Sequence, residues 1–300
     1  MWFLLIASLI WGGSFGLNHM AMCYVTPAAA GLLLCAVSML MFLPFAFYGP
    51  ARKLRLPLAA IGFLQLGLMN YFYLGSFAHL DGHLVALLNL SAPLYVGIFA
   101  DLFERRRPWQ RLFFAAVSIA ICAYALGTGI KGRCVAQGFL ECQAANLVYG
   151  LGMVLYGRLM RAHKEIPERA AFFWMWLGAA APLLWALIMT PWSNLSERFT
   201  WAPQQVATLL FLAIFCGGIG NFLWNKGVVA VSSGALLAFT NLPCVLGLLF
   251  GRLFFGEPGS WPRQLFALAV LLLLLWLDIK ITDVRAKKKF FAAETCTFLP

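Results

Sequence analysis

Two stretches of the chain, LVALLNLSAPLYVG at residues 84–97 and GALLAFTNLPCVLG at residues 234–247, align with each other without a gap. The offset between them is 150 residues, which is half of the 300-residue chain. Pro93 falls on Pro243 in this alignment. Repetition on this scale indicates that the chain consists of two related halves.

Shorter matches follow the same order in both halves. They pair Leu9–Gly12 with Leu147–Gly150, Asn70–Phe72 with Asn221–Leu223, and Trp109–Arg111 with Trp261–Arg263. Two Leu-rich helices can always be aligned somehow, but chance does not readily place Pro-x-x-x-Gly and Trp-x-Arg in the same order twice. The sequence therefore predicts a duplication.

The composition indicates that both halves are embedded in a membrane. Hydrophobic residues make up 62% of the chain and charged residues 11%, whereas about a quarter of the residues of a soluble domain are charged. Apolar runs long enough to cross a bilayer recur along the chain, without the period-two alternation of membrane strands. The ten predicted spans are residues 2–19, 27–49, 57–76, 84–103, 110–128, 143–160, 170–190, 204–225, 233–254 and 262–280.

Basic residues predict the orientation of these spans. If the N-terminus is cytoplasmic, 17 of the 22 Lys and Arg residues fall in internal segments, in agreement with the positive-inside rule. Because five spans carry the chain across the membrane, the second half would be inverted relative to the first. The net charge of +11 lies in short clusters between apolar runs, so it indicates topology and anionic lipid, not a nucleic-acid partner.

The expected fold is an all-α membrane protein of ten transmembrane helices, built as two inverted five-helix repeats. We place the first repeat at residues 1–128, an external loop at 129–142, the second repeat at 143–280 and a basic cytoplasmic tail at 281–300. Cys134 and Cys142 flank the loop and could pair in an oxidising compartment. The sequence leaves that disulfide open.

Four segments resemble the drug/metabolite transporter superfamily, EamA type. They are Trp11-Gly12, FLWNKGV at 222–228, NLP at 241–243 and Gly256-Glu257, and the resemblance covers residues 1–280. The first half departs from the pattern, because Glu104 and three arginines stand where a Gly-Glu pair is expected. The resemblance implies transport of amino acids, amines, carboxylates or other small metabolites through a central cavity that spans from both halves surround. We expect a bacterial cytoplasmic membrane as the location, with both termini cytoplasmic.

Polar residues inside the spans are the candidates for substrate binding, because such residues are costly in a membrane and often functional. Amides would bond a substrate's polar groups, and Tyr and Trp rings would hold an apolar or cationic part. The alternative for each residue is a bond between helices, worth about 0.6 kcal/mol. The candidates are Trp11, Asn70, Tyr71, Tyr73, Asn89, Tyr95, Tyr149, Tyr156, Asn221, Trp224, Asn225 and Asn241.

Three further residues have possible roles in gating or anion binding. Pro93 and Pro243 each remove a backbone donor in mid-span, which predicts either a flexing point or a static kink. Lys226 at a helix end either extends to the interface or contacts an anionic substrate group. No charged residue falls clearly at mid-membrane, although proton-coupled carriers often use a buried carboxylate. We therefore expect a facilitator or exchanger for a neutral, zwitterionic or weakly charged substrate.

Enzymatic activity is not predicted. Gly12–Gly16 matches the pattern G-x-S-x-G around Ser14, but this motif needs a strand-turn-helix context and here it lies inside a span. No catalytic residue, metal site or cofactor is expected. The leading hypothesis is a secondary transporter of a small polar metabolite that works by alternating access. The alternative is a non-transporting membrane receptor or scaffold, which would lack a polar cavity between the halves.

Overall fold

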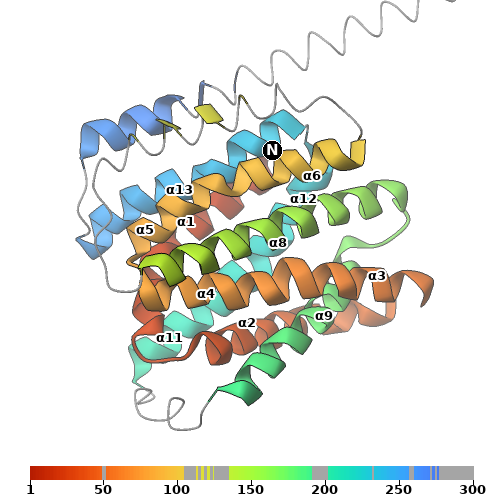
Figure 1. Ribbon diagram of the computed structural model, residues 1–300. Coiled ribbons are helices and arrows are strands. Elements are labelled where there is room, and N and C mark those ends of the chain that lie inside the picture. The colour runs from red at the N-terminus through yellow and green to blue at the C-terminus, as the bar shows by residue number, and fades with distance from the viewer. Residues whose placement is uncertain are drawn as a thin grey trace, which may run out of the picture.

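The computed structural model describes residues 1–48, 52–104, 135–190, 202–231, 233–256 and 260–270, together with 113, 116–117, 120–121, 124, 272–273 and 276. Within these residues the secondary structure is helical, and the long helices lie side by side in one bundle (Figure 1). The fifth predicted span at 110–128, the end of the tenth and the basic tail fall wholly or largely outside the described residues.

The first half supplies four helical crossings of the bundle. In order they consist of α1 (Trp2–Met22); α2 (Pro27–Phe42) with the 3-10 turn η1 (Leu43–Tyr48); α3 (Arg52–Gly62), η2 (Phe63–Leu68) and α4 (Met69–His79); and α5 (Gly82–Leu88), η3 (Asn89–Ser91) and α6 (Ala92–Glu104). Local sequence sets some of these bounds. Pro27 stands at the first position of α2, where a missing N–H costs nothing, and the Thr26 side chain accepts from the Ala29 amide.

The second half of the chain supplies the remaining long helices among the described residues. They are α8 (Val135–Ala162); α9 (Glu168–Met189); α11 (Pro203–Phe211), η4 (Leu212–Gly220) and α12 (Asn221–Ala230); and α13 (Ser233–Phe255). Gly256 ends α13 in the left-handed region, at φ 65°, which glycine adopts without a steric penalty. Helix α8 begins at Val135, so residues 135–142 are helical where the sequence predicted a loop.

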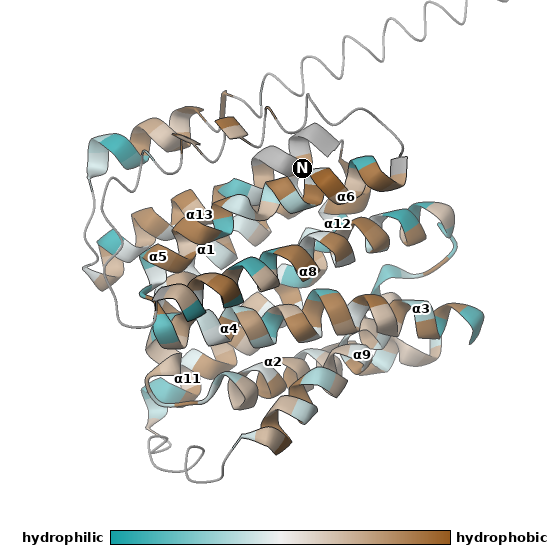
Figure 2. Ribbon diagram, viewed as in Figure 1, coloured by the Kyte–Doolittle hydropathy of each residue, from teal (hydrophilic) through white to brown (hydrophobic). Residues whose placement is uncertain are grey.

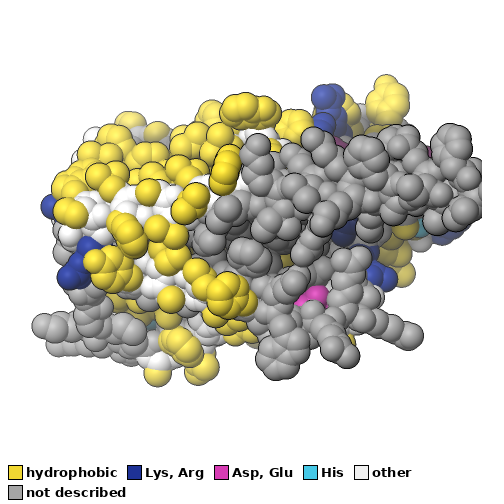
Figure 3. Space-filling view, turned by 90° about the horizontal axis from the view of Figure 1, so that it is seen from above, with side chains coloured by type: hydrophobic (Ala, Val, Ile, Leu, Met, Phe, Trp, Pro, Cys, Tyr) yellow, Lys and Arg dark blue, Asp and Glu magenta, His cyan; other side chains and the backbone are white. Residues whose placement is uncertain are grey.

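Six helices of the described residues are long and apolar enough to cross a membrane. They are Trp2–Met22, Pro27–Tyr48, Arg52–His79, Gly82–Phe103, Glu168–Met189 and Pro203–Ala230. Apolar residues dominate these ribbons (Figure 2), and hydrophobic side chains predominate on the described part of the face shown in Figure 3. Large apolar side chains such as Trp2, Phe47 and Ile188 are exposed, as expected of a surface that contacts lipid.

Two crossings contain a π-helical segment at a comparable place. In the first half η2 precedes Asn70 by one residue, and in the second half η4 immediately precedes Asn221. A π turn lengthens the hydrogen-bonded ring by one residue, and such turns are frequent at functional sites. Hydrophobic periodicity gave no sign of either segment.

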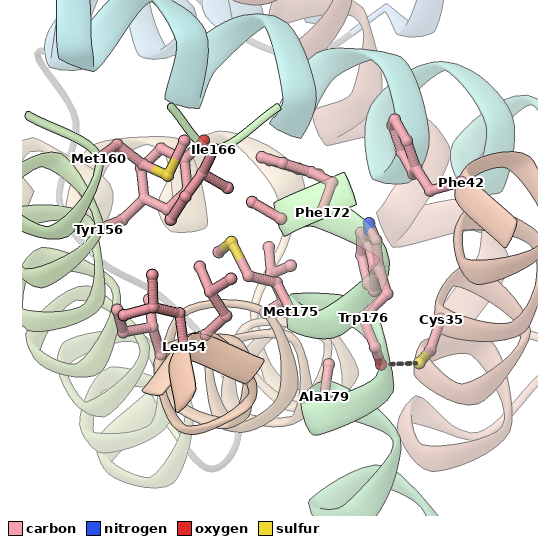
Figure 4. Packing of buried hydrophobic residues seen from close by; sticks show 14 of the residues in the cluster. Cys35, Phe42, Leu54, Tyr156, Met160, Ile166, Phe172, Met175, Trp176 and Ala179 are labelled. Carbon is pink, nitrogen blue, oxygen red and sulfur yellow. Dashed lines mark hydrogen bonds between the residues drawn. The ribbon is translucent and has the colours of Figure 1, made fainter. Parts of the chain in front are cut away.

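Helices α3 and α9 approach each other very closely. A methyl group placed on Gly62 of α3 would collide with the Met175 backbone of α9, and one on Gly178 of α9 with the Ala59 backbone of α3. Small residues allow this close contact between membrane helices. Beside this contact lies a buried cluster that joins α2, α3, α8 and α9, which we call the peripheral cluster. In it the Cys35 thiol donates to the Trp176 carbonyl (3.2 Å; Figure 4).

Candidate functional site

A cavity of about 120 Å³ lies inside the bundle, between elements of both halves. Its walls come from α1, α4, η3 and α6 of the first half and from α8, η4, α12 and α13 of the second, with one contact from α2. The lining residues are Trp11, Ser14, Phe15, Asn18, Leu34, Met69, Asn70, Tyr73, Leu74, Asn89, Ala92, Ala145, Asn146, Tyr149, Cys216, Gly217, Asn221, Trp224, Thr240, Pro243 and Cys244.

Aromatic rings form one part of this lining. The Trp11 and Trp224 rings lie 4.9 Å apart at an interplanar angle of 35°, and Tyr149 meets Trp11 edge-on at 6.5 Å. The Trp11 indole is fixed by donation to the Cys216 carbonyl (3.2 Å). Gly220 makes room for it, because a methyl group there would lie 2.7 Å from the Trp11 Nε1. Rings held in this way offer flat apolar walls to a ligand.

Two asparagines that follow the π-helical segments form a second part of the cavity lining. Asn70 Nδ2 donates to the Leu66 carbonyl (2.6 Å), and Asn221 Nδ2 donates to the carbonyls of Cys216 (3.2 Å) and Gly217 (3.1 Å). Each side-chain NH₂ group therefore bonds to carbonyls of the preceding π segment. The Asn221 Oδ1 is buried and has no hydrogen-bond partner among the described residues.

Two further polar residues of the lining were not predicted from the sequence. Asn18 and Asn146 line the cavity and are 4% and 5% exposed. Asn146 Nδ2 donates to Ser91 Oγ and to the Leu88 carbonyl, both at 3.1 Å. Asn146 stands three residues before Tyr149, so helical spacing from Tyr149 would have identified it.

A buried amide pair lies beside the cavity, and the sequence predicted only one of its members, Asn225. Gln65 Nε2 of η2 donates to Asn225 Oδ1 of α12 (2.9 Å), and both residues are fully buried. The Asn225 Nδ2 donates to the Asn221 carbonyl (3.0 Å). The pair joins the two crossings that carry π segments. The sequence does not single out Gln65, because it is one polar residue in the apolar stretch FLQLGL.

Seven of the twelve candidate binding residues line the cavity, and five do not. Trp11, Asn70, Tyr73, Asn89, Tyr149, Asn221 and Trp224 are in the lining. Tyr71 is 39% exposed on the outer surface. Tyr95 donates to Gln143 Oε1 (3.0 Å), and Tyr156 packs edge-on to Phe172 in the peripheral cluster (Figure 4). Asn225 bonds to Gln65, and Asn241 is fully buried outside the lining.

The two prolines and the lysine occupy different settings. Pro93 follows a break, because α5 gives way to the turn η3 and α6 begins at Ala92. Pro243 lines the cavity inside α13, which continues past it. Lys226 stands outside the lining. Its Nζ lies 3.5 Å from a Glu168 carboxylate oxygen and 5.0 Å from the centre of the Phe3 ring.

The lining has no charged side chain among the described residues. It combines amide and hydroxyl groups with aromatic walls, and apolar helices of membrane-spanning length enclose it. A site of this kind, between two halves of a bundle, is typical of a membrane transporter for small molecules.

The chain belongs to the EamA-like transporter family, whose model matches residues 1–127 and 138–277. It is therefore an integral membrane protein of a transporter family, and the family assigns transport rather than catalysis. The family named from the residues is confirmed, and membership favours a transporter over a receptor or scaffold.

Several curated relatives align over nearly the whole chain. A probable biotin transporter of Pseudomonas aeruginosa is 30% identical over 93% of this chain and 97% of its own length. A biotin transporter of Salmonella typhimurium is 29% identical over 92% of both chains, and one of Escherichia coli (strain K12) is 28% identical over 95% of both. A crystal structure with 17% identity superimposes with a TM-score of 0.68 over 91% of this chain and 93% of its own, which supports the fold.

Proposed function

We propose that the chain is a secondary transporter that carries biotin, or a small metabolite closely related to it, across the bacterial inner membrane. The observation that carries this proposal is the uncharged cavity of amides and aromatic rings between the two halves. Biotin is a bicyclic urea with an aliphatic carboxylate chain. Its urea would bond with amides and its ring system would pack on the Trp and Tyr faces.

The arrangement of the lining supports two inverted five-helix repeats. The crossings at the cavity come in matched sets: α1, η2–α4 and η3–α6 from the first half, and α8, η4–α12 and α13 from the second. The glycines of the repeated Trp-Gly and Tyr-Gly pairs also correspond. A methyl group on Gly12 would meet Leu246 of α13, and one on Gly150 would meet Tyr95 of α6. Each half thus packs its first crossing against the fourth crossing of the other half.

We expect alternating access because each half packs its first crossing against the fourth crossing of the other half. If the α1–α13 and α6–α8 contacts rock in opposite senses, the cavity opens first to one side of the membrane and then to the other. In this mechanism both termini are cytoplasmic, and the Gln65–Asn225 pair separates the cavity from the cytoplasmic side. The uncharged lining fits a facilitator or exchanger.

An uptake experiment tests the proposal. The chain is expressed in a bacterial biotin auxotroph that lacks its own biotin carrier, and entry of radiolabelled biotin is measured at nanomolar concentration. We expect growth on low biotin and saturable uptake that unlabelled biotin abolishes. Counterflow of labelled biotin in proteoliposomes then shows that this chain alone suffices. Uptake no greater than in cells with an empty vector, from a chain that is present in the membrane, contradicts biotin as the substrate.

A further inference from the structure

Asn70 and Asn221 have one feature that the proposed function does not use, which is the direction of their side-chain carbonyl oxygens. Both residues line the cavity, and both are nearly buried, at 6% and 5% exposure. The NH₂ group of each is already bonded to carbonyls of its own crossing, to Leu66 in η2 and to Cys216 and Gly217 in η4. These bonds fix which way each amide is turned, because only the NH₂ group can donate to a carbonyl.

The remaining oxygens are hydrogen-bond acceptors without partners. Asn221 Oδ1 is buried and unpaired among the described residues. The Asn70 oxygen is not among the fully buried atoms, and it accepts no hydrogen bond from another described residue. A buried acceptor without a donor, such as Asn221 Oδ1, is unfavourable, and most such groups are bonded in native proteins. An unpaired acceptor in a cavity wall therefore indicates a ligand that brings an N–H or O–H group.

Asn70 and Asn221 also lie at similar distances along their helices from the Gln65–Asn225 hydrogen bond. The Gln65–Asn225 bond joins their crossings, and these crossings run in opposite directions in the bundle (Figure 1). Asn70 lies five residues after Gln65, and Asn221 lies four residues before Asn225. Both therefore stand about one helical turn from the bond, on the same side of it and on different walls of the cavity.

We propose that Asn70 and Asn221 are a pair of acceptors, one from each half, that bind the two N–H groups of a cyclic urea. This inference rests on the proposed function and names the part of biotin that the cavity recognises. The urea enters the cavity between the two oxygens, and the ring system packs on Trp11 and Trp224. The carboxylate chain extends beyond the uncharged lining. A ligand without one of the N–H groups leaves an acceptor unpaired, so it is rejected.

Competition against uptake of labelled biotin by the wild-type chain tests the inference without any variant. Desthiobiotin keeps both urea N–H groups, whereas biotin methylated on one urea nitrogen lacks one of them. We expect desthiobiotin to compete within about threefold of biotin and the methylated compound to compete at least about tenfold more weakly, as sites built to bond an N–H group discriminate strongly. Competition by the methylated compound equal to that by biotin overturns the inference, although the protein remains a biotin carrier.

Two variants test which residues discriminate between biotin and its methylated form. Asn70→Leu and Asn221→Leu remove the acceptors at similar side-chain volume. Thr208→Val is the control for expression, because it removes a half-buried hydroxyl of α11 that bonds to the Gln204 carbonyl and lies outside the cavity lining. In each Leu variant we expect a KM for biotin at least about tenfold higher and a smaller preference for biotin over its methylated form. A preference unchanged from wild type in both variants, when both reach the membrane, overturns the assignment to these residues. If the wild-type chain takes up no biotin, the proposed substrate itself is wrong and the inference is withdrawn with it.

Discussion

The contact between α6 and α8 differs sharply from the corresponding contact between α13 and α1. Ser91, beside the first, lies 2.7 Å from Gln143 Oε1 and accepts from Asn146 Nδ2 at 3.1 Å. Its counterpart in the alignment of the halves is Asn241 on α13. That amide is fully buried, and neither its oxygen nor its nitrogen has a hydrogen-bond partner among the described residues.

Under the proposed duplication, the two halves share helix packing at these contacts but differ in the side chains that bond there. A network of polar side chains holds the first contact together. The second depends on close packing, since a methyl group on Gly12 would lie 2.6 Å from the Leu246 Cβ. An unsatisfied buried amide costs about 1–3 kcal/mol, so the present arrangement is unfavourable at Asn241. A carrier that rocks between two arrangements needs neither of them to be strongly preferred.

The largest effect is expected from overpacking the α1–α13 contact. Gly12→Leu forces α1 and α13 apart, because both the side chain and the backbone of Leu246 stand in the way. We expect a loss of about 3 kcal/mol in stability, measured by unfolding of the purified protein in detergent. Gly13→Ala is the matched control, because its added methyl would have only Phe250 nearby, at 3.9 Å. Equal stability of the two variants would show that the close approach is not needed.

Removing the polar network at the α6–α8 contact should lower stability by a smaller amount. In Gln143→Leu, Ser91 and Tyr95 lose an acceptor at 2.7 and 3.0 Å. Bonds between membrane helices average about 0.6 kcal/mol and reach about 1.7 kcal/mol, so we expect a destabilisation of about 1–2 kcal/mol in the same unfolding assay. A variant as stable as wild type would mean that the network contributes no net stability.

A substitution at Asn241 should raise the stability of the protein. Asn241→Leu removes the unpaired amide and keeps a similar volume, so stability should rise by about 1 kcal/mol. Biotin uptake should slow, because the arrangement seen here would become too favourable. Unfolding and the initial uptake rate are measured on the same preparation. A destabilised variant would show that Asn241 has a partner in the native protein.

The smallest effect is expected outside both contacts. Lys226 and Glu168 form an ion pair at 3.5 Å, with side chains 39% and 27% exposed. Pairs of this kind contribute about 0–1 kcal/mol. Lys226→Met should therefore lower stability by less than 1 kcal/mol and leave the KM for biotin within about twofold of wild type. A KM raised tenfold would instead support the anion contact considered from the sequence.

Among the described residues, the sequence predicted the positions of the helices well and the orientation of individual side chains less well. Runs of apolar residues located the crossings, because length and hydropathy depend on composition alone. Tyr71 shows the limit of this approach, since it follows Asn70 by about 100° around the helix and faces outward. Tyr156 lies two turns from Tyr149 on nearly the same face, but that distance along the axis carries it out of the cavity and into the peripheral cluster.

The π segments and the Gln65–Asn225 pair show why the rest could not be predicted. A widened turn depends on which carbonyls lose their partners in three dimensions, and neither FLQLGL nor LAIFCGGIG differs in composition from an ordinary span. A bond between residues 160 positions apart is likewise invisible without the packing of the two halves. The repeat in the sequence does pair Asn70 with Asn221, so it predicts corresponding positions for these two residues.

The π segments also bear on the origin of the chain. A helix gains such a turn when one residue is added to it, which shifts every later side chain by about 100° around the axis. Two such shifts before two matched asparagines require either two separate insertions or one insertion that was later copied. Under the proposed duplication, the single event is the simpler history. The ancestral half-length protein would already have carried the insertion, and two copies of it would have presented one asparagine each to the space between them.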